Sequence, residues 1–264
     1  MTGREPAGRA VVIGGASGIG AAIVRALAAA GAPVTVADRD VAAARTLAAE
    51  LGAEPAALDV TDEDSVAALF ESVPGPVDFV VNTAGVSVLG LLTELPADKW
   101  RRVLDVCLTG AFLTIKHAAP RLAAGGSIAV LSSLNARQPA IGMGAYCSAK
   151  AGLGMLVEVA ALELAPRGIR VNAIAPGLVR TPLTAASLEL PGVEADYLAN
   201  TPLGRAGTPE EIADAALYLR RAGWLTGETL DLNGGAHLLR YPDVHGHIRR
   251  ATAPAAGKEP TWTR

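Results

Sequence analysis

Two residues four positions apart, Tyr146 and Lys150, are the part of this sequence best suited to chemistry. Residues with this spacing share one face of a helix. A free phenol titrates near pH ~10 and a free lysine near ~10.4, so neither exchanges protons readily at neutral pH. An ammonium beside a phenol favours the phenolate and lowers its pKa. The pair is therefore predicted to act as general acid and base on an alcohol or a ketone, although ordinary surface pairs share the spacing.

A glycine-rich turn, Gly14–Gly20, directly follows the first apolar run of the chain. Glycines allow a tight turn in which backbone N–H groups at a helix N-terminus approach a pyrophosphate. Tight strand-to-helix turns also use glycine without any ligand. The position directly after an N-terminal strand nevertheless favours a dinucleotide-binding loop.

Asp38 ends the second predicted strand, where an acid accepts hydrogen bonds from an adenosine ribose. A carboxylate at this point repels a 2′-phosphate, so NAD is the expected cofactor rather than NADP. The neighbouring Arg39 argues the other way, because a basic side chain could hold that phosphate. Asp38 could also serve only as the N-cap of the next helix.

The elements that would position these residues alternate along the chain. Short β-branched runs predict strands at Ala10–Ile13, Val34–Ala37, Pro55–Leu58, Val77–Val81, Ser127–Leu131, Arg170–Ile174 and Thr229–Leu232. Alanine- and leucine-rich patterns predict helices at Ile19–Ala30, Val41–Leu51, Glu63–Ser72, Ala97–Ala123, Tyr146–Pro166 and Pro209–Arg221. This alternation predicts a single-domain α/β fold of the Rossmann type, with a doubly wound parallel sheet of about seven strands and helices on both faces.

The predicted domain covers residues 1–236, followed by a tail at residues 237–264. Residues 181–207 interrupt the alternation, are rich in Leu, Pro and Thr, and are expected to form a mobile substrate flap. The tail is polar and is expected to be irregular, with little order beyond about Arg250.

Composition limits the possible functions. The chain has 264 residues, 50% of them hydrophobic, and a formal net charge of −3. These values suit a soluble globular domain and give no reason to expect nucleic acid or a membrane as partner. Apolar runs are broken by glycine and charge short of a membrane span, and the first residues lack a signal-peptide pattern. Cys107 and Cys147 are too few for a disulfide framework, so a cytoplasmic location is expected.

Several motifs, in order from about Arg9 to Ala236, resemble those of the short-chain dehydrogenase/reductase family with a Tyr-x-x-x-Lys active site. They are Gly14-x-x-x-Gly18-Ile19-Gly20, Leu58-Asp59-Val60, Asn82-Thr83-Ala84-Gly85, Ser132-Ser133, Tyr146-x-x-x-Lys150, Asn172–Thr181, Thr226-Gly227 and Asn233-Gly234-Gly235. Ser133 lies thirteen residues before Tyr146, the usual spacing in the family. The resemblance is specific for the fold but says little about the substrate.

The resemblance implies an oxidoreductase that moves a hydride reversibly between a secondary alcohol or ketone and nicotinamide. It implies that Tyr146 exchanges the substrate proton, that Lys150 lowers the pKa of Tyr146 and binds the nicotinamide ribose, and that Ser133 positions the substrate oxygen. The expected cofactor contacts are Gly14, Ser17, Gly18, Ile19, Gly20, Asp38, Arg39, Asp59, Val60, Asn82, Ala84, Gly85, Tyr146, Lys150, Pro176, Gly177, Val179 and Thr181.

Three positions depart from the family pattern: Ile13 replaces Thr, Thr83 replaces Asn, and Cys107 replaces the Asn that joins Ser, Tyr and Lys in a catalytic tetrad. The first two changes are expected to have little effect. In the family that Asn helps to hold a water that passes protons to solvent, and a thiol is a weak hydrogen-bond partner. We expect slower proton relay with the chemistry retained, or a thiol that only packs.

A mainly apolar substrate pocket is expected, suited to an alicyclic, aromatic or acyl alcohol or ketone. Its predicted apolar residues are Val86, Val88, Leu134, Ile141, Met143, Leu178, Leu183 and Leu188, and its predicted polar residues are Arg137, Gln138, Tyr197 and Asn200. No metal site is expected, since no cysteine or carboxylate completes a set with His237, His245 and His247. The resemblance implies a homotetramer or a homodimer, and the tail could extend an interface or reach a neighbour's pocket.

Three functions remain open from the sequence. The leading one is an NAD-dependent alcohol dehydrogenase. An NADPH-dependent biosynthetic ketoreductase is the alternative that Asp38 opposes. A catalytically weakened NAD-binding scaffold or sensor is favoured only by Cys107 and opposed by Ser133, Tyr146 and Lys150.

Overall fold

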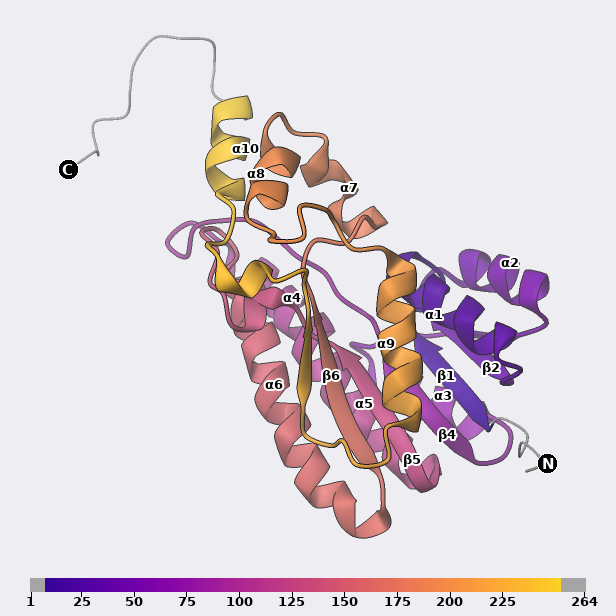
Figure 1. Cartoon of the computed structure of the whole chain (residues 1–264). Coiled ribbons are helices and arrows are strands. Elements are labelled where there is room, and N and C mark those ends of the chain that lie inside the picture. Colours follow the sequence, from indigo (N-terminus) through magenta and orange to yellow (C-terminus); the bar gives the residue numbers. More distant parts are fainter. Residues whose placement is uncertain (1–7, 253–264) are drawn as a thin grey trace.

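The computed structural model describes residues 8–252, so residues 1–7 and the last part of the predicted tail, residues 253–264, lie outside it. A parallel sheet in the strand order β3-β2-β1-β4-β5-β6-β7 forms the centre (Figure 1). Its strands are β1 Arg9–Ile13, β2 Val34–Asp38, β3 Glu54–Ala57, β4 Val77–Asn82, β5 Leu122–Leu131, β6 Arg170–Pro176 and β7 Thr229–Leu232. The direction of strand addition reverses between β1 and β4, the switch point at which open parallel sheets bind ligands.

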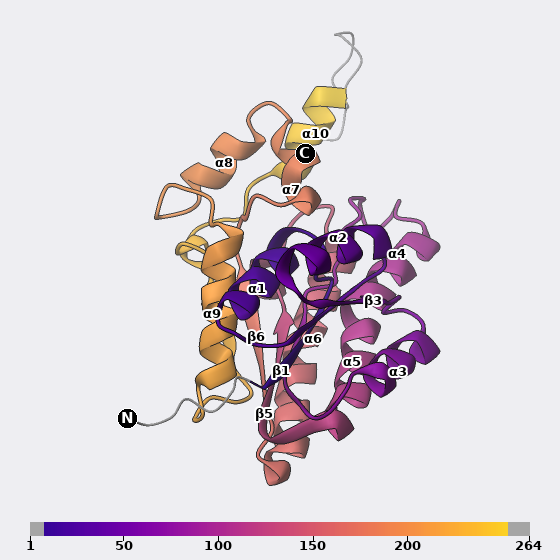
Figure 2. The same cartoon turned by 90° about the vertical axis from the view of Figure 1, so that its right-hand side faces the viewer.

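Helices cover both faces of the sheet, as Figure 2 shows from the side. Within β1, Ala10 and Val12 pack into the core under α1 (Gly18–Ala29), α2 (Val41–Leu51) and α9 (Pro209–Arg221). Val11 and Ile13 pack into the core under α3 (Glu63–Ser72), α5 (Gly110–Ala118) and α6 (Gly144–Leu164). Both faces of the strand are buried, as its continuous apolar sequence requires. The predicted single-domain Rossmann-type fold is confirmed.

The helix expected over Ala97–Ala123 is divided. It consists of α4 (Ala97–Leu104), the π-helical segment η1 (Asp105–Thr109), α5 and the 3₁₀ turn η2 (Ala119–Arg121). Leu122 already belongs to β5 and pairs with Val77 of β4. Pro120 lies in the terminal turn and cannot donate the N–H that a continuing helix needs. The alanine-rich stretch after it was wrongly predicted as helix because its composition suits a helix better than a strand.

Three helices gather at the end of the sheet where the strands end (Figure 1). Residues 181–207 contain α7 (Pro182–Leu188) and α8 (Val193–Ala199). The predicted tail begins with the 3₁₀ turn η5 (Ala236–Leu238) and continues into α10 (Val244–Thr252). The expectation of an irregular tail is therefore wrong up to residue 252.

The helix that carries Tyr146 and Lys150 is long and apolar. With the turn that follows it, Gly144–Arg167 has a mean hydropathy of 1.3 over its most apolar window and is long enough to span a membrane by length and composition alone. This corrects the expectation that every apolar run falls short of a span. In the fold, α6 packs against β6 and against the 3₁₀ turn η3 (Leu134–Ala136). Core helices of globular proteins also meet such a criterion.

Candidate active site

Two positions of the loop between β1 and α1 require glycine. Gly14 has a φ of 71°, in the left-handed region, and Gly20 lies so close to the loop that an added Cβ would be 2.0 Å from the Gly14 carbonyl oxygen. The Gly14 N–H donates to the Ala37 carbonyl of β2 at 2.9 Å. Ser17 is the N-cap residue of α1, but its hydroxyl makes no capping bond. A helix N-terminus with an uncommitted hydroxyl is a suitable anion site.

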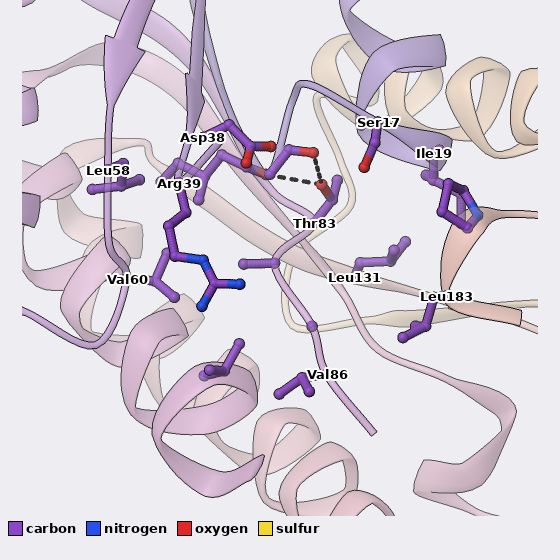
Figure 3. A pocket seen from close by; sticks show the side chains of 18 of the residues that line it. Ser17, Ile19, Asp38, Arg39, Leu58, Val60, Thr83, Val86, Leu131 and Leu183 are labelled. Atoms are coloured by element: carbon purple, nitrogen blue, oxygen red, sulfur yellow. Dashed lines mark hydrogen bonds between the residues drawn. The ribbon is translucent and has the colours of Figure 1, made fainter. Parts of the chain in front are cut away.

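Asp38 is held by the backbone at the end of β2. Its Oδ2 accepts from the Ala16 N–H at 3.0 Å, and its Oδ1 accepts from the Asp40 N–H at 2.9 Å. The N-cap of α2 is Asp40, whose carboxylate accepts from the Ala43 N–H, so the capping alternative for Asp38 is wrong. Figure 3 shows Asp38 and Arg39 both facing one cavity, with the Arg39 guanidinium extending toward Val60.

That cavity has a volume of about 440 Å³. It is lined by Ile13, Gly14, Ser17, Gly18, Ile19, Gly20, Asp38, Arg39, Leu58, Asp59, Val60, Thr83, Ala84, Gly85, Val86, Arg102, Val106, Leu131, Thr181, Pro182 and Leu183. In Figure 3 Leu58 and Val60 lie on the side of Arg39, and Ile19 and Leu183 lie on the opposite side. The cavity therefore has an apolar wall at each end and glycine backbone between them, an arrangement that fits a dinucleotide.

Most of the expected cofactor residues line this cavity, but Asn82 does not. The Asn82 side chain donates to the Thr114 hydroxyl at 2.9 Å and accepts from the Ala84 N–H at 2.9 Å. Its amide thus joins the end of β4 to α5. Thr83, one of the departures, donates to the carbonyl oxygens of Ile13 and Gly14 at 2.8 and 3.1 Å. A threonine at this position therefore fastens β4 to the glycine loop.

Asp59 is a second carboxylate at the cavity. The Thr61 hydroxyl donates to it at 2.7 Å and the Thr61 N–H at 2.9 Å. These bonds lower the pKa of Asp59, and the positive charges of Arg102 and Arg39 lower it further. Arg102, on α4, also lines the cavity, and no sequence motif indicated it.

The remaining expected cofactor residues line the first cavity, a second cavity or neither; Lys150 and Val179 line neither. Thr181 lines the first cavity, whereas Pro176, Gly177 and Tyr146 line a second one. Val179 is buried and pairs with Gly207 in an isolated bridge, so its side chain lines neither. Leu183 lines both cavities and marks their junction.

The structure brings Ser133, Tyr146 and Lys150 together at this junction. Tyr146 lies in the first turn of α6, and Ser133 follows the end of β5. Lys150 is 2% exposed, and its Nζ lies 5.6 Å from the centroid of the Tyr146 ring. The same Nζ donates to the Leu131 carbonyl at 2.6 Å. Leu131 and the neighbouring Gly85 line the first cavity, whereas Lys150 itself lines neither cavity.

The electrostatic prediction for the pair needs correction. In the protein alone, burial raises the pKa of Tyr146 above its usual value, and the hydrogen bond with Ser133 opposes this rise. Burial also lowers the pKa of Lys150. Desolvation disfavours the charged form of each group, and this effect exceeds the attraction expected between the two. The phenol is therefore protonated at neutral pH in this state.

Cys107 lies in the π-helical segment η1. Short π-helical turns are frequent at functional sites. It is 2% exposed. Its sulfur accepts from the Val86 N–H at 3.4 Å and donates to the Val86 carbonyl at 3.3 Å. It also packs with Val103 and Ala149. The thiol therefore fills space and also holds the loop after β4 by two weak hydrogen bonds.

The second cavity has a volume of about 430 Å³ and is closed by segments far apart in the sequence. It is lined by Ser87, Leu89, Ser133, Leu134, Asn135, Met143, Tyr146, Pro176, Gly177, Leu178, Leu183, Thr184, Ala186, Ser187, Leu190, Tyr197, Tyr241, Val244 and Ile248. Of the predicted pocket residues, this cavity includes Leu134, Met143, Leu178, Leu183 and Tyr197.

Other predicted pocket residues have different surroundings. Val86 lines the first cavity, Ile141 is 67% exposed, and Arg137 pairs with Asp231. Gln138 donates to backbone carbonyls of Ala236 and Leu239, Asn200 donates to Asp196, and neither Val88 nor Leu188 lines the second cavity. Tyr241, Val244 and Ile248 were missed because they lie in the segment that was expected to be irregular.

One carboxylate joins the flap to the C-terminal segment. Asp196 of α8 accepts from the Arg240 guanidinium at 2.7 Å and from the Asp243 N–H at 2.9 Å, and it faces His247 at 3.4 Å. Burial alone would raise the pKa of Asp196, but these partners outweigh burial and lower it. We call this cluster the Asp196 latch, comprising Asp196, Arg240, Asp243 and His247.

The histidines of the C-terminal segment, His237, His245 and His247, have separate neighbours. His237 contacts the Asn233 side chain at 2.9 Å, His247 faces Asp196, and His245 packs near Gly142. Within residues 8–252, no group of three or more His, Cys, Asp or Glu side chains is placed to hold a metal ion.

Comparisons with known proteins agree with this geometry. The family model described as enoyl-(acyl carrier protein) reductase matches residues 14–237. The chain is 42% identical over 239 residues to cis-4-hydroxycyclohexanecarboxylate dehydrogenase of Sinomonas cyclohexanicum, covering 86% of this chain and 95% of the relative. It is 39% identical over 250 residues to 3beta-hydroxysteroid dehydrogenase 1 of Eggerthella lenta, covering 89% and 95%. A solved short-chain type dehydrogenase/reductase from Mycobacterium ulcerans superposes with a TM-score of 0.88 at 33% identity, covering 92% of this chain and 94% of that one.

Proposed function

The chain belongs to the short-chain dehydrogenase/reductase family, and from this premise we propose that it is an NAD-dependent dehydrogenase of an alicyclic secondary alcohol. Relatives in the family that match it are named as dehydrogenases of hydroxyl groups, so an oxidoreductase acting on CH–OH groups is its general activity. The finer points, namely the cofactor, the substrate and the assembly, are argued from the site.

The observation that carries the proposal is the position of Ser133, Tyr146 and Lys150 between two cavities. Ser133 and Tyr146 open into the cavity of about 430 Å³. Lys150 bonds to Leu131, which lines the glycine-loop cavity. A substrate in one cavity and a dinucleotide in the other would meet at these three side chains.

Each side chain has a distinct task in the proposed reaction. Ser133 donates a hydrogen bond to the substrate oxygen and fixes its position. Tyr146 takes the hydroxyl proton in oxidation and returns it to the carbonyl oxygen in reduction. Lys150 binds the nicotinamide ribose. Its ammonium, together with the positive charge of the bound oxidised nicotinamide, favours the phenolate of Tyr146. The bound nicotinamide supplies the acceptor or donor of the hydride, so the alcohol loses a proton and a hydride and becomes a ketone.

Asp38 supports NAD as the cofactor. Two backbone N–H groups fix its carboxylate at the cavity, where it can accept hydrogen bonds from a ribose diol. A 2′-phosphate at the same place would meet a negative charge. Arg39 and Arg102 in the same cavity favour the second candidate, an NADPH-dependent ketoreductase. Dissociation constants of NADH and NADPH, measured by fluorescence titration, separate the two: tighter binding of NADPH would overturn our choice.

The substrate cavity supports an alicyclic alcohol. Most of its lining is apolar, with a few hydroxyl and amide groups, and its volume suits a small ring system. The two named relatives are dehydrogenases of cis-4-hydroxycyclohexanecarboxylate and of a 3beta-hydroxysteroid, both ring alcohols. A cyclohexanol is therefore the first substrate to test.

We also propose a homo-oligomer, a tetramer or failing that a dimer, in the cytoplasm. The apolar side chains of Met155 and Leu162 on α6 are 60% and 78% exposed, and contiguous exposed apolar residues favour an interface. Both cysteines are free, which suits a reducing compartment. Sedimentation of the wild type and of Leu162→Glu tests the interface: an unchanged mass in the variant would exclude this face.

The decisive experiment measures NADH formation from NAD with a panel of cyclohexanols and hydroxysteroids. Tyr146→Phe should lower turnover by at least about 10²-fold, because the general acid and base is lost, while NADH still binds. Tyr218→Phe, at an exposed tyrosine of α9, is the matched control and should behave as the wild type. Equal loss of NADH binding and turnover in Tyr146→Phe would argue against the assignment. Tight NADH binding without turnover of any alcohol would favour the scaffold function.

A further inference from the structure

Two tyrosines outside the catalytic group line the substrate cavity from its roof, which is formed by α7, α8, α10 and residues 239–243. Tyr197 lies on α8, and Tyr241 lies between η5 and α10. Their hydroxyl oxygens are 2.7 Å apart, and their rings meet edge to face with centroids 5.8 Å apart. Both residues line the cavity of about 430 Å³ that contains Ser133 and Tyr146. The pair is therefore a polar point in a mostly apolar roof.

The hydrogen-bond capacity of this pair is not exhausted. Two phenols carry two protons, and the bond between them uses one. The Tyr241 hydroxyl also approaches the Met143 sulfur at 3.6 Å, but a thioether is a weak acceptor. One O–H donor and several lone pairs therefore remain available. A ligand oxygen in the cavity would be a stronger acceptor for this O–H than the thioether is.

Asn135 connects the pair to the reacting centre. Its N–H donates to the Ser133 hydroxyl at 3.1 Å. Its side-chain amide donates to the Gln138 carbonyl at 3.1 Å, and its proximity to Tyr241 lowers the pKa of that phenol against the larger raising effect of burial. Ser133 and Tyr241 thus lie on either side of Asn135, which also lines the cavity.

The cavity lining contains no charged side chain. None of the residues lining it is Asp, Glu, Lys, Arg or His. Two polar side chains close to the roof in sequence, Arg240 and His247, are directed to Asp196. Burial raises the pKa values of Tyr197 and Tyr241, so both remain neutral phenols at neutral pH. A carboxylate in this cavity would lack a cationic partner and would be bound poorly.

We propose that Tyr197 and Tyr241 form a second oxygen site that selects uncharged ring alcohols bearing another hydroxyl or keto group, with the first oxygen at Ser133 and Tyr146. The inference rests on the proposed function, because it assumes that the reacting oxygen binds at Ser133 and Tyr146. Tyr197 and Tyr241 are specificity-determining residues in this arrangement, and they take no part in proton or hydride transfer.

The test compares two substrates of similar shape, trans-1,4-cyclohexanediol and trans-4-methylcyclohexanol. The wild type should prefer the diol, since only the diol places an oxygen at the pair. Tyr241→Phe and Tyr197→Phe keep the rings and remove one hydroxyl each. In each variant the ratio of kcat/KM for the diol to that for the methyl compound should fall by about tenfold, mainly through KM for the diol. Tyr218→Phe is the control and should leave the ratio unchanged.

Several results would overturn the inference. A wild type that does not prefer the diol excludes the second oxygen site. A ratio unchanged in both variants shows that neither phenol contacts the substrate, and equal losses on both substrates show a packing role only. Preference for trans-4-hydroxycyclohexanecarboxylate over the diol excludes the uncharged class.

A binding measurement separates failure of this inference from failure of the proposed function. Calorimetry with the NADH complex of Tyr146→Phe, which should bind NADH without reducing a ketone, compares 4-hydroxycyclohexanone with 4-methylcyclohexanone and adds Tyr241→Phe in the same background. Tighter binding of the hydroxyketone, lost in Tyr241→Phe, would support the second site even if no cyclohexanol is oxidised. Equal binding of the two ketones would refute the second site even if Tyr146→Phe confirms the dehydrogenase.

Discussion

The glycine-loop cavity and the roof of the substrate cavity are assembled by different kinds of contact. The first is formed by turns that directly follow buried strands. Backbone bonds fix it, such as the Gly14 N–H to Ala37 at 2.9 Å and the Thr83 N–H to Ile13 at 2.9 Å. The roof consists of α7, α8, α10 and residues 239–243, which all lie outside the sheet (Figure 1). It is joined by side chains, chiefly the Asp196 latch and the Tyr197–Tyr241 bond.

Because of this difference, the two regions should tolerate different amino-acid substitutions. Backbone contacts in a tight loop leave no room for an added atom, so a small substitution there should affect the whole region. Side-chain contacts between helices can be changed one at a time. We therefore expect changes in the loop to abolish nucleotide binding and changes in the roof to alter substrate binding while the nucleotide still binds.

The largest effect is expected for Gly20→Ala. The added Cβ would lie 2.0 Å from the Gly14 carbonyl oxygen and 2.8 Å from the Thr83 hydroxyl, so the loop must shift. We expect a loss of about 3 kcal/mol in unfolding free energy and no saturable NADH binding, measured by denaturation and fluorescence titration. Gly223→Ala, where an added Cβ meets nothing, is the control. Normal NADH binding by Gly20→Ala would break the proposed contrast between the regions.

The next largest effect is a pH dependence confined to the catalytic group. Because burial raises the pKa of Tyr146, the phenol is protonated at neutral pH. At pH values below that pKa, the phenolate fraction rises about tenfold per pH unit, so kcat/KM for alcohol oxidation should rise with a slope approaching one. The dissociation constant of NADH should change little over the same range. A flat oxidation profile would contradict the role of Tyr146 as base.

A smaller effect is expected when the latch is weakened by Asp196→Asn. The KM for a cyclohexanol should rise about tenfold and the unfolding free energy should fall by about 1 kcal/mol, with unchanged NADH binding. The control is Asp214→Asn on the exposed face of α9. If NADH binding weakens as much as alcohol binding, the two regions are not separable in the way proposed.

The latch also has a defined pH range. Its partners lower the pKa of Asp196 in the folded protein. The contribution to stability is therefore present above the unfolded carboxyl pKa near ~4 and disappears as the pH falls through the lower folded value. Wild type and Asp196→Asn should consequently differ in melting temperature at pH 7 and converge in strong acid.

The smallest effect is expected for Cys107→Asn. The thiol already bonds to both backbone groups of Val86, so the geometry should be preserved. If Cys107 slows proton relay, the amide should raise turnover by about threefold where proton transfer limits the rate. Steady-state rates in H₂O and D₂O across pH measure this, and unchanged turnover at every pH would exclude the idea.

The signals of the glycine-loop region are local, and residues that the sequence grouped there do line one cavity. Gly14, Asp38 and the apolar strands around them each report on a few neighbouring residues. The pair Tyr146 and Lys150 was likewise predicted to share a helix face, and both do lie on α6. Asn82 shows the limit of this approach, since its motif position gave no sign that its amide would be used by Thr114 of α5.

The roof could not be predicted because its contacts cross long distances in sequence. Tyr197 and Tyr241 are separated by 44 positions, and no local pattern links them. The composition of residues 237–252 suggested an irregular tail, whereas packing of Val244 and Ile248 against the substrate cavity favours a helix. The pKa of Tyr146 was predicted in the wrong direction for a similar reason. The sequence gives the spacing of Tyr146 to Lys150 but not how deeply the two side chains are buried.

The bond between Tyr197 and Tyr241 has a consequence for how such a chain could acquire new substrates. A replacement without a hydroxyl at either position removes the hydrogen bond between the two phenols at the cavity. Directed evolution by one change at a time would therefore cross intermediates with poor binding. Libraries that vary positions 197 and 241 together, with the glycine loop kept constant, should yield altered specificities far more often than either single-site library.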